Sequence, residues 1–173
     1  TAGRDPLRDE GRGYVQQLRG AGINVAHDEF DSLPHGFLRM AKYSWKELVG
    51  APHSLVRHPD MPRCVFKLLW DTLEARQEIF VFFLNLAKDG SHYWVFAHVT
   101  PTLDSSGNII GYHSNRRRPD RGPIDKISPI YRALCQEEAR HSNAKEGMRA
   151  SFDMMVGLLK RQGVGYDEFV LSL

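Results

Sequence analysis

Three side chains able to bind an anion or exchange a proton stand close together in RHPDMP, residues 57–62: Arg57, His58 and Asp60. Arg57 offers a planar fork of donors that matches a phosphate or carboxylate group. A helix is predicted to begin just after them, because Pro62 suits a first helical turn and Asp60 is a candidate N-cap. The free N–H groups and positive dipole end of that helix would strengthen an anion site. The alternative is a local Arg57–Asp60 ion pair that fixes the loop, and the residues alone do not choose between the two.

Asn85 is the second polar anomaly, because it lies within the otherwise apolar run IFVFFLNLA. A buried amide must find hydrogen-bond partners. Asn85 would therefore bond either to the backbone or to the edge of a planar heterocycle. Trp70, Trp94 and Phe96 supply aromatic surface for such a ligand, although core packing explains them equally well.

Other catalytic or metal chemistry has little support in the sequence. No GxSxG, P-loop or HExxH motif occurs. Cys64 and His58 are conceivable as a nucleophile pair, but a free thiol on the first turn of an apolar helix is expected to be buried instead. His92 and His98 share one strand face, with His113 on the neighbouring strand, yet no carboxylate or cysteine accompanies them at ligand spacing. We therefore expect neither an enzyme nor a metal site.

Composition indicates one globular domain with a short extension, since 42% of the 173 residues are apolar and 25% are charged. The net charge of +2 gives no argument for nucleic acid, and the basic run at 116–118 is interpreted as a solvated strand exit. We recognise no membrane span and no signal peptide, and Cys64 and Cys135 lack disulfide or metal spacing. A cytoplasmic location, where thiols stay reduced, is expected.

Short helices are predicted ahead of a β region. Ser44 and Glu47 form a capping box, which starts a helix that ends near Gly50. A second helix follows Pro62. Its apolar residues recur at helical spacing: Val65, Phe66, Leu69, Trp70 and Leu73.

The β region is predicted to be an antiparallel meander followed by two amphipathic helices. Aromatic and β-branched runs joined by tight turns indicate three sequential strands. The strands are 78–87, 92–100 and 109–118, and the helices are 124–140 and 145–162. This order of elements indicates an α+β fold.

Three segments together resemble a PAS domain of the bacterial aerotaxis-receptor type. They are YSWKELVGAPHSLVRHPDMPRCVFKLLWDTL, NLAKDGSHYWVFAHVTP and GNIIGYHSNRRRP, within residues 37–119. The resemblance implies a five-stranded antiparallel sheet with short helices across one face, enclosing a cofactor. We expect a flexible or short helical segment at 1–22, the PAS sensory domain at 23–119 and a C-terminal helical extension at 120–173.

In that branch of the family the cofactor is non-covalent FAD. The resemblance assigns the RHPD residues to flavin retention and Asn85 to the edge of the isoalloxazine ring. Light-sensing relatives carry an adduct-forming cysteine where this chain has His53, so no cysteinyl-flavin photocycle is expected. His113 stands where they keep a flavin-facing glutamine. The expected cofactor site comprises Arg57, His58, Asp60, Asn85, Trp70, Trp94, His53 and His113.

The N-terminal segment departs from the family pattern. The first two strands should lie just upstream of FLRMAKYS, but residues 1–36 do not show them. Either the first hairpin has been replaced or this segment does not belong to the native frame.

The leading hypothesis is a cytosolic flavin sensor of redox state or oxygen availability, as in aerotaxis and chemotaxis. It would signal to a partner protein through the C-terminal helices or across a homodimer. The apolar stripes of those helices fit an intermolecular bundle and packing against the chain's own sheet equally well. One alternative is a haem-binding gas sensor with His53, His58 or His92 as the axial ligand. The other is a cofactor-free interaction or dimerisation module.

Overall fold

The computed structural model describes residues 36–173, which fall into two compact units. The described part of the first unit comprises residues 36–56 and 86–93, and the second comprises 57–85 and 94–173. The predicted segment 1–22 and the position of the family's first hairpin lie outside the described residues.

The described part of the first unit contains three short helical elements and the tip of a hairpin. Their bounds are α2 Gly36–Ala41, α3 Trp45–Leu48 and the 3-10 helix η1 His53–Val56. The predicted helix start at Ser44 is confirmed, because Glu47 Oε2 accepts from the Ser44 backbone N at 2.9 Å and from Ser44 Oγ at 2.8 Å. The Glu47 half of the capping box therefore closes this turn.

Two lysines tie the hairpin tip to the helices of this unit. Lys88 Nζ bonds to Glu47 Oε1 at 2.5 Å, and its backbone N donates to the Ala41 carbonyl at 2.9 Å. Lys42 pairs with Asp89. Hydrogen bonds from Lys88 and then from Ser44 lower the pKa of Glu47 to about 2.

Substituting Lys88 by Gln is expected to raise the pKa of Glu47 towards its ordinary value of about 4.3. Because the folded pKa is depressed, the stabilisation from Glu47 is present above the unfolded pKa and is lost as the pH falls towards about 2. An NMR titration of the Glu47 carboxyl measures this shift. Lys46→Gln is the matched control, and an equal titration curve in both variants would contradict the assigned pairing.

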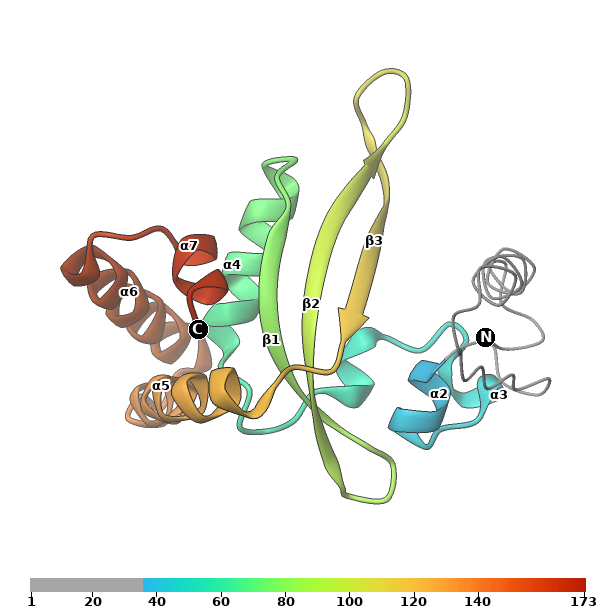
Figure 1. Ribbon diagram of the computed structural model, residues 1–173, viewed down its shortest axis with the longest axis horizontal. Helices are drawn as coiled ribbons and strands as arrows, with labels where there is room; N and C mark the ends of the chain where they lie inside the picture. The colour runs from blue at the N-terminus through green and yellow to red at the C-terminus, as the bar shows by residue number, and fades with distance from the viewer. Residues whose placement is uncertain (1–35) are drawn as a thin grey trace, which may run out of the picture. The chain divides into compact units, whose positions relative to one another are not determined.

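The second unit is built on an antiparallel sheet in the order β1-β2-β3 (Figure 1). The strands are β1 Ile79–Leu86, β2 His92–Leu103 and β3 Ile109–Arg117. The predicted meander is therefore confirmed. Strand β2 runs three residues beyond its predicted end because its ladder with β3 continues to Leu103, opposite Ile109.

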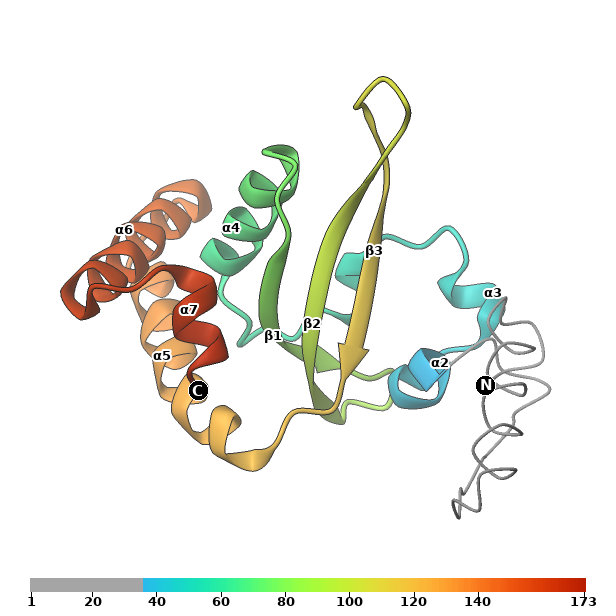
Figure 2. The same ribbon diagram turned by 45° about the horizontal axis from the view of Figure 1, so that its top comes forward.

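Four helices complete the second unit: α4 Arg63–Glu74, α5 Arg121–Ala139, α6 Ala144–Gln162 and α7 Tyr166–Leu171. The two predicted C-terminal helices are confirmed, whereas α7 was not predicted. Helix α6 packs against α5 and α4, as both views show (Figures 1 and 2). No helix among residues 36–173 combines the length and apolarity needed to cross a bilayer.

The two faces of the sheet meet different helices. Helix α4 covers one face, where Phe66 stacks on Phe83 with ring centroids 5.6 Å apart. The other face carries Phe82 and Phe96, whose rings lie 4.6 Å apart. On that face the ring of Tyr131 from α5 approaches Trp94 at 5.9 Å. The apolar side of α5 therefore packs against the sheet of the same chain.

Backbone groups on the outer edge of β1 form hydrogen bonds with side chains from the C-terminal helices. The Tyr131 hydroxyl donates to the Phe82 carbonyl at 2.9 Å, and the Phe80 N–H donates to Asp167 Oδ1 at 3.0 Å. These bonds come from α5 and α7 to alternate residues of one strand. They occupy backbone groups that an edge strand would otherwise leave open.

Candidate cofactor site

The structure brings together two of the predicted cofactor residues, Arg57 and Asn85. They form an isolated antiparallel β-bridge, although 28 positions separate them in the sequence. Asn85 lies near the end of β1 and is 3% exposed. The bridge anchors the start of the RHPD loop to the strand that carries the amide.

The Asn85 amide is the most informative polar group of this site. It lies on the same side of β1 as Phe83, because alternate strand residues share a face, and that face meets α4. Its Nδ2 has no hydrogen-bond partner among the described residues. An unpaired buried donor costs about 1–3 kcal/mol, so this arrangement fits a bound acceptor such as a ring carbonyl or nitrogen. The donor therefore suits the heterocycle edge of a flavin.

Arg57 packs on an aromatic ring and forms no direct ion pair with a carboxylate among the described residues, although the charge of Glu138 acts on it. Its guanidinium lies 3.6 Å from the centroid of Phe66, a cation–π distance. Partial removal from water, followed by the nearby Arg63 charge, lowers its pKa. Within residues 36–173 no ion pair joins Arg57 to Asp60, so the predicted local salt bridge does not form. The fork of donors stays available to an anion.

His58 and Asp60 shape the loop between Arg57 and α4. His58 Nδ1 accepts a hydrogen bond from the Asp60 N–H at 3.1 Å, and it lies 3.8 Å from Asp60 Oδ2. Nδ1 is therefore the acceptor nitrogen of this ring in the structure. The prediction that Asp60 caps the next helix is wrong, because α4 begins at Arg63 after Pro62 and has no side-chain cap at that position.

The aromatic and histidine candidates do not join this pair in one site. Trp70 is 45% exposed and packs edge-on against Tyr112 of β3. Trp94 and His113 lie on the opposite face from Asn85. There His113 is paired across the ladder with Thr100 and its Nε2 lies 3.2 Å from Asn115 Oδ1. The sequence did not specify which face each strand residue occupies relative to β1.

The remaining histidine candidates also lie apart. His53 opens η1 in the first unit, and its side chain lies outside what the structure describes. His92 is exposed at the start of β2. No group of three or more potential metal ligands occurs among residues 36–173.

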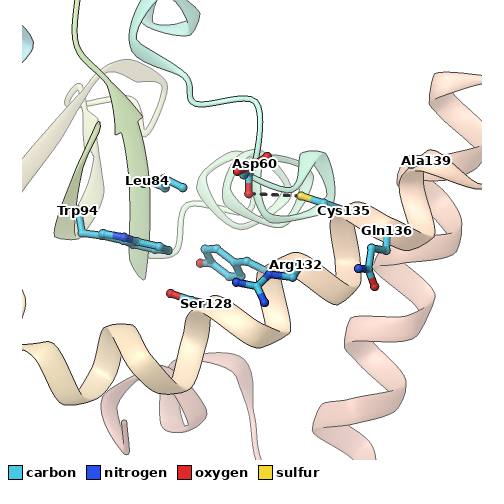
Figure 3. Close-up of a pocket in the computed structure, with 9 residues that line it drawn as sticks. Asp60, Leu84, Trp94, Ser128, Arg132, Cys135, Gln136 and Ala139 are labelled. Carbon is cyan, nitrogen blue, oxygen red and sulfur yellow. Dashed lines mark hydrogen bonds between the residues drawn. The ribbon is translucent and has the colours of Figure 1, made fainter. Parts of the chain in front are cut away.

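A pocket of about 490 Å³ lies on the opposite face of the sheet, between Trp94 and one side of α5 (Figure 3). Its volume is within the range of small-molecule sites. The sequence analysis did not identify its α5 residues, which have ordinary helical spacing. They are Ser128, Tyr131, Arg132, Cys135, Gln136 and Ala139.

Both thiols are poor nucleophiles. Cys64 is buried, as predicted, and burial raises its pKa to about 11. Burial is also the largest cause that raises the pKa of Cys135 to about 12. Since the thiolate is the reactive form, both cysteines are inert near neutral pH.

Comparisons with known proteins point to one fold for the central part of the chain. The PAS fold matches residues 32–116. The aerotaxis receptor of Escherichia coli (strain K12) is 40% identical over 98 residues, which cover 57% of this chain and 19% of the receptor. A solved light-oxygen-voltage domain studied with a flavin analogue superposes with a TM-score of 0.50 and 23% identity. That superposition covers 75% of this chain and 96% of the other, which shows a shared fold.

A different kind of protein matches a shorter stretch. The carboxylic ester hydrolase LipN of Mycobacterium tuberculosis is 52% identical over 40 residues, 23% of this chain and 11% of that enzyme. The chain thus spans about a fifth or less of the aerotaxis receptor and of this hydrolase.

Proposed function

We propose that the chain is a sensory module that binds FAD, since residues 32–116 match the PAS fold and the chain is related in sequence to the aerotaxis receptor. It reports redox state or oxygen availability to a signalling partner in the cytoplasm, as in aerotaxis and chemotaxis. The sensory part extends over residues 23–119, and residues 120–173 form its helical extension.

The observation that supports this proposal best is the unpaired Nδ2 of Asn85. A buried amide donor on the α4 face, bridged to the RHPD loop, fits the polar edge of an isoalloxazine ring. FAD would supply reversible one- and two-electron chemistry when bound. Asn85 would orient the ring and respond to a change in its charge.

The RHPD loop has a separate role in this proposal. Arg57 keeps its guanidinium on Phe66, so the donors are held in place before an anion arrives. His58 and Asp60 hold the loop in shape through their own hydrogen bond. Trp70 packs against Tyr112 away from Arg57, and Trp94 and His113 lie on the face opposite Asn85, so these three residues are not included.

The signal would leave through the C-terminal helices, in a homodimer or in a complex with a partner protein. Helix α5 contacts the sheet and helix α6 contacts α4, so the extension meets both layers of the sensory part. We propose no catalytic activity, because Cys64 and Cys135 are protonated and the chain has no GxSxG motif.

An absorption spectrum of the freshly purified protein, with the released chromophore identified by mass, tests the cofactor. We expect a flavin spectrum that bleaches with dithionite and returns in air. A colourless protein that takes up no added FAD would refute the flavin proposal and favour an interaction module. A haem spectrum would refute it in favour of a gas sensor.

Arg57→Ala is expected to weaken FAD binding about tenfold or more, the effect of losing a hydrogen bond to a charged group. The matched control is Arg63→Ala, which removes a neighbouring exposed arginine. Fluorescence titration of the stripped protein with FAD measures both affinities. Equal FAD affinities for the two variants would contradict the role assigned to Arg57.

A further inference from the structure

The first turn of α4 is capped by a residue from a distant helix. Pro62 at the N-cap position offers no side-chain acceptor, so the first N–H groups of the helix need another partner. The Cys64 N–H donates to Glu138 Oε1 of α5 at 3.1 Å. A carboxylate there satisfies an orphan donor and interacts favourably with the helix dipole.

The same oxygen also holds α6. The buried Ser151 Oγ lies 2.9 Å from Glu138 Oε1 and 2.9 Å from the Met148 carbonyl of its own helix, so its one proton is shared between these two acceptors. Helix α6 comes very close to α5 at this point, because a Cβ on Gly147 would lie 2.5 Å from the Glu138 carbonyl oxygen. Glu138 therefore joins α4, α5 and α6.

A second contact from α5 reaches the loop itself. Cys135 Sγ donates to the Asp60 carbonyl at 3.3 Å, as the dashed line in Figure 3 shows. Positions 135 and 138 lie on one side of the helix because residues three apart are neighbours. One side of α5 thus holds both the end of the RHPD loop and the start of α4.

From these contacts we infer that Glu138 is a positioning residue that couples the RHPD loop to the α5–α6 pair. Only six residues separate Arg57, which forms the bridge with Asn85, from Cys64, which donates to Glu138 at the other end of the loop. A displacement of the loop must either break the bond to Glu138 or move α5 and α6 with it. The claim that this coupling transmits a signal from FAD rests on the proposed function. The contacts of Glu138 with α4 and α6 exist without FAD and do not depend on it.

Hydrogen exchange measured by mass spectrometry on the full chain tests the link without a ligand. In Glu138→Ala we expect roughly tenfold faster exchange of the Cys64 amide and of α6 around Ser151. Glu138→Gln keeps an acceptor and should fall between the wild type and Glu138→Ala. Glu137→Ala is the matched control, because Glu137 pairs only with exposed or half-exposed Arg140 and His141 in the described part of the chain. Exchange at Cys64 and Ser151 that is equal in the two alanine variants would overturn the inference.

The same hydrogen-exchange experiment is then repeated with FAD added. We expect FAD to slow exchange of α6 in the wild type, and this protection to be lost in Glu138→Ala while it survives in Glu137→Ala. Protection that survives in Glu138→Ala would overturn the coupling through this residue. If the wild type binds no FAD, the proposed function fails, and the ligand-free comparison still decides the role of Glu138.

Discussion

Replacing Asn85 by Leu is expected to have two effects of opposite sign. The affinity for FAD should fall about ten- to hundredfold, because the amide donor that would meet the ring edge is lost. The free energy of unfolding of the flavin-free protein should rise by up to about 1–3 kcal/mol, since an unpaired buried donor is replaced by an apolar group of similar size. Fluorescence titration and urea unfolding measure the two effects.

The opposite signs separate a binding residue from a packing residue. If Asn85 only fills the core and pairs within the chain, Asn85→Leu would lower stability and leave FAD binding unchanged. Asn115→Leu is the matched control, since Asn115 is an exposed asparagine on β3. It should leave the FAD affinity unchanged.

Replacing Gly147 by Ala is expected to destabilise the second unit by about 1–3 kcal/mol. The added Cβ would lie 2.5 Å from the Glu138 carbonyl oxygen, so α6 must move away from α5. That oxygen belongs to the backbone of a helix and cannot rotate away as a side chain would. Urea unfolding followed by circular dichroism measures the loss.

Gly157→Ala in the same helix supplies the control, and it should have the opposite sign. The nearest atom to its added Cβ is Arg161 Nη1 at 3.7 Å, an ordinary contact with a flexible side chain. Alanine should therefore stabilise α6 by about 0.5–1 kcal/mol through helix propensity. Equal effects at the two glycines would show that the α5–α6 contact is not as close as described.

The sequence predicted the sheet well because its signals are local. Aromatic and β-branched runs with a tight turn at 88–91 define β1 and β2, and the DSSGN turn leads into β3. The relative face of each residue depends on how neighbouring strands are aligned, which no local pattern specifies. For that reason Trp94 and His113 were grouped with Asn85, although they lie on the other face.

The helix caps also show that sequence patterns predict local contacts but not contacts between distant segments. The Ser44 start was predicted because both partners lie within one turn. The N-cap of α4 was assigned to Asp60, whereas the acceptor for the Cys64 N–H is Glu138, 74 residues beyond Cys64 in the chain. Helix α7 was missed because six residues are too few to show a clear helical period.

The covered edge of β1 also bears on how shortened versions of this chain would behave. Without residues 121–173 the Phe80 N–H and Phe82 carbonyl would lose Asp167 and Tyr131, and the apolar face around Phe82 and Phe96 would be uncovered. An open, hydrophobic strand edge is a template for pairing with other chains and for aggregation. Self-association of a truncated PAS fragment would therefore report the exposed edge and not the oligomeric state of the intact chain.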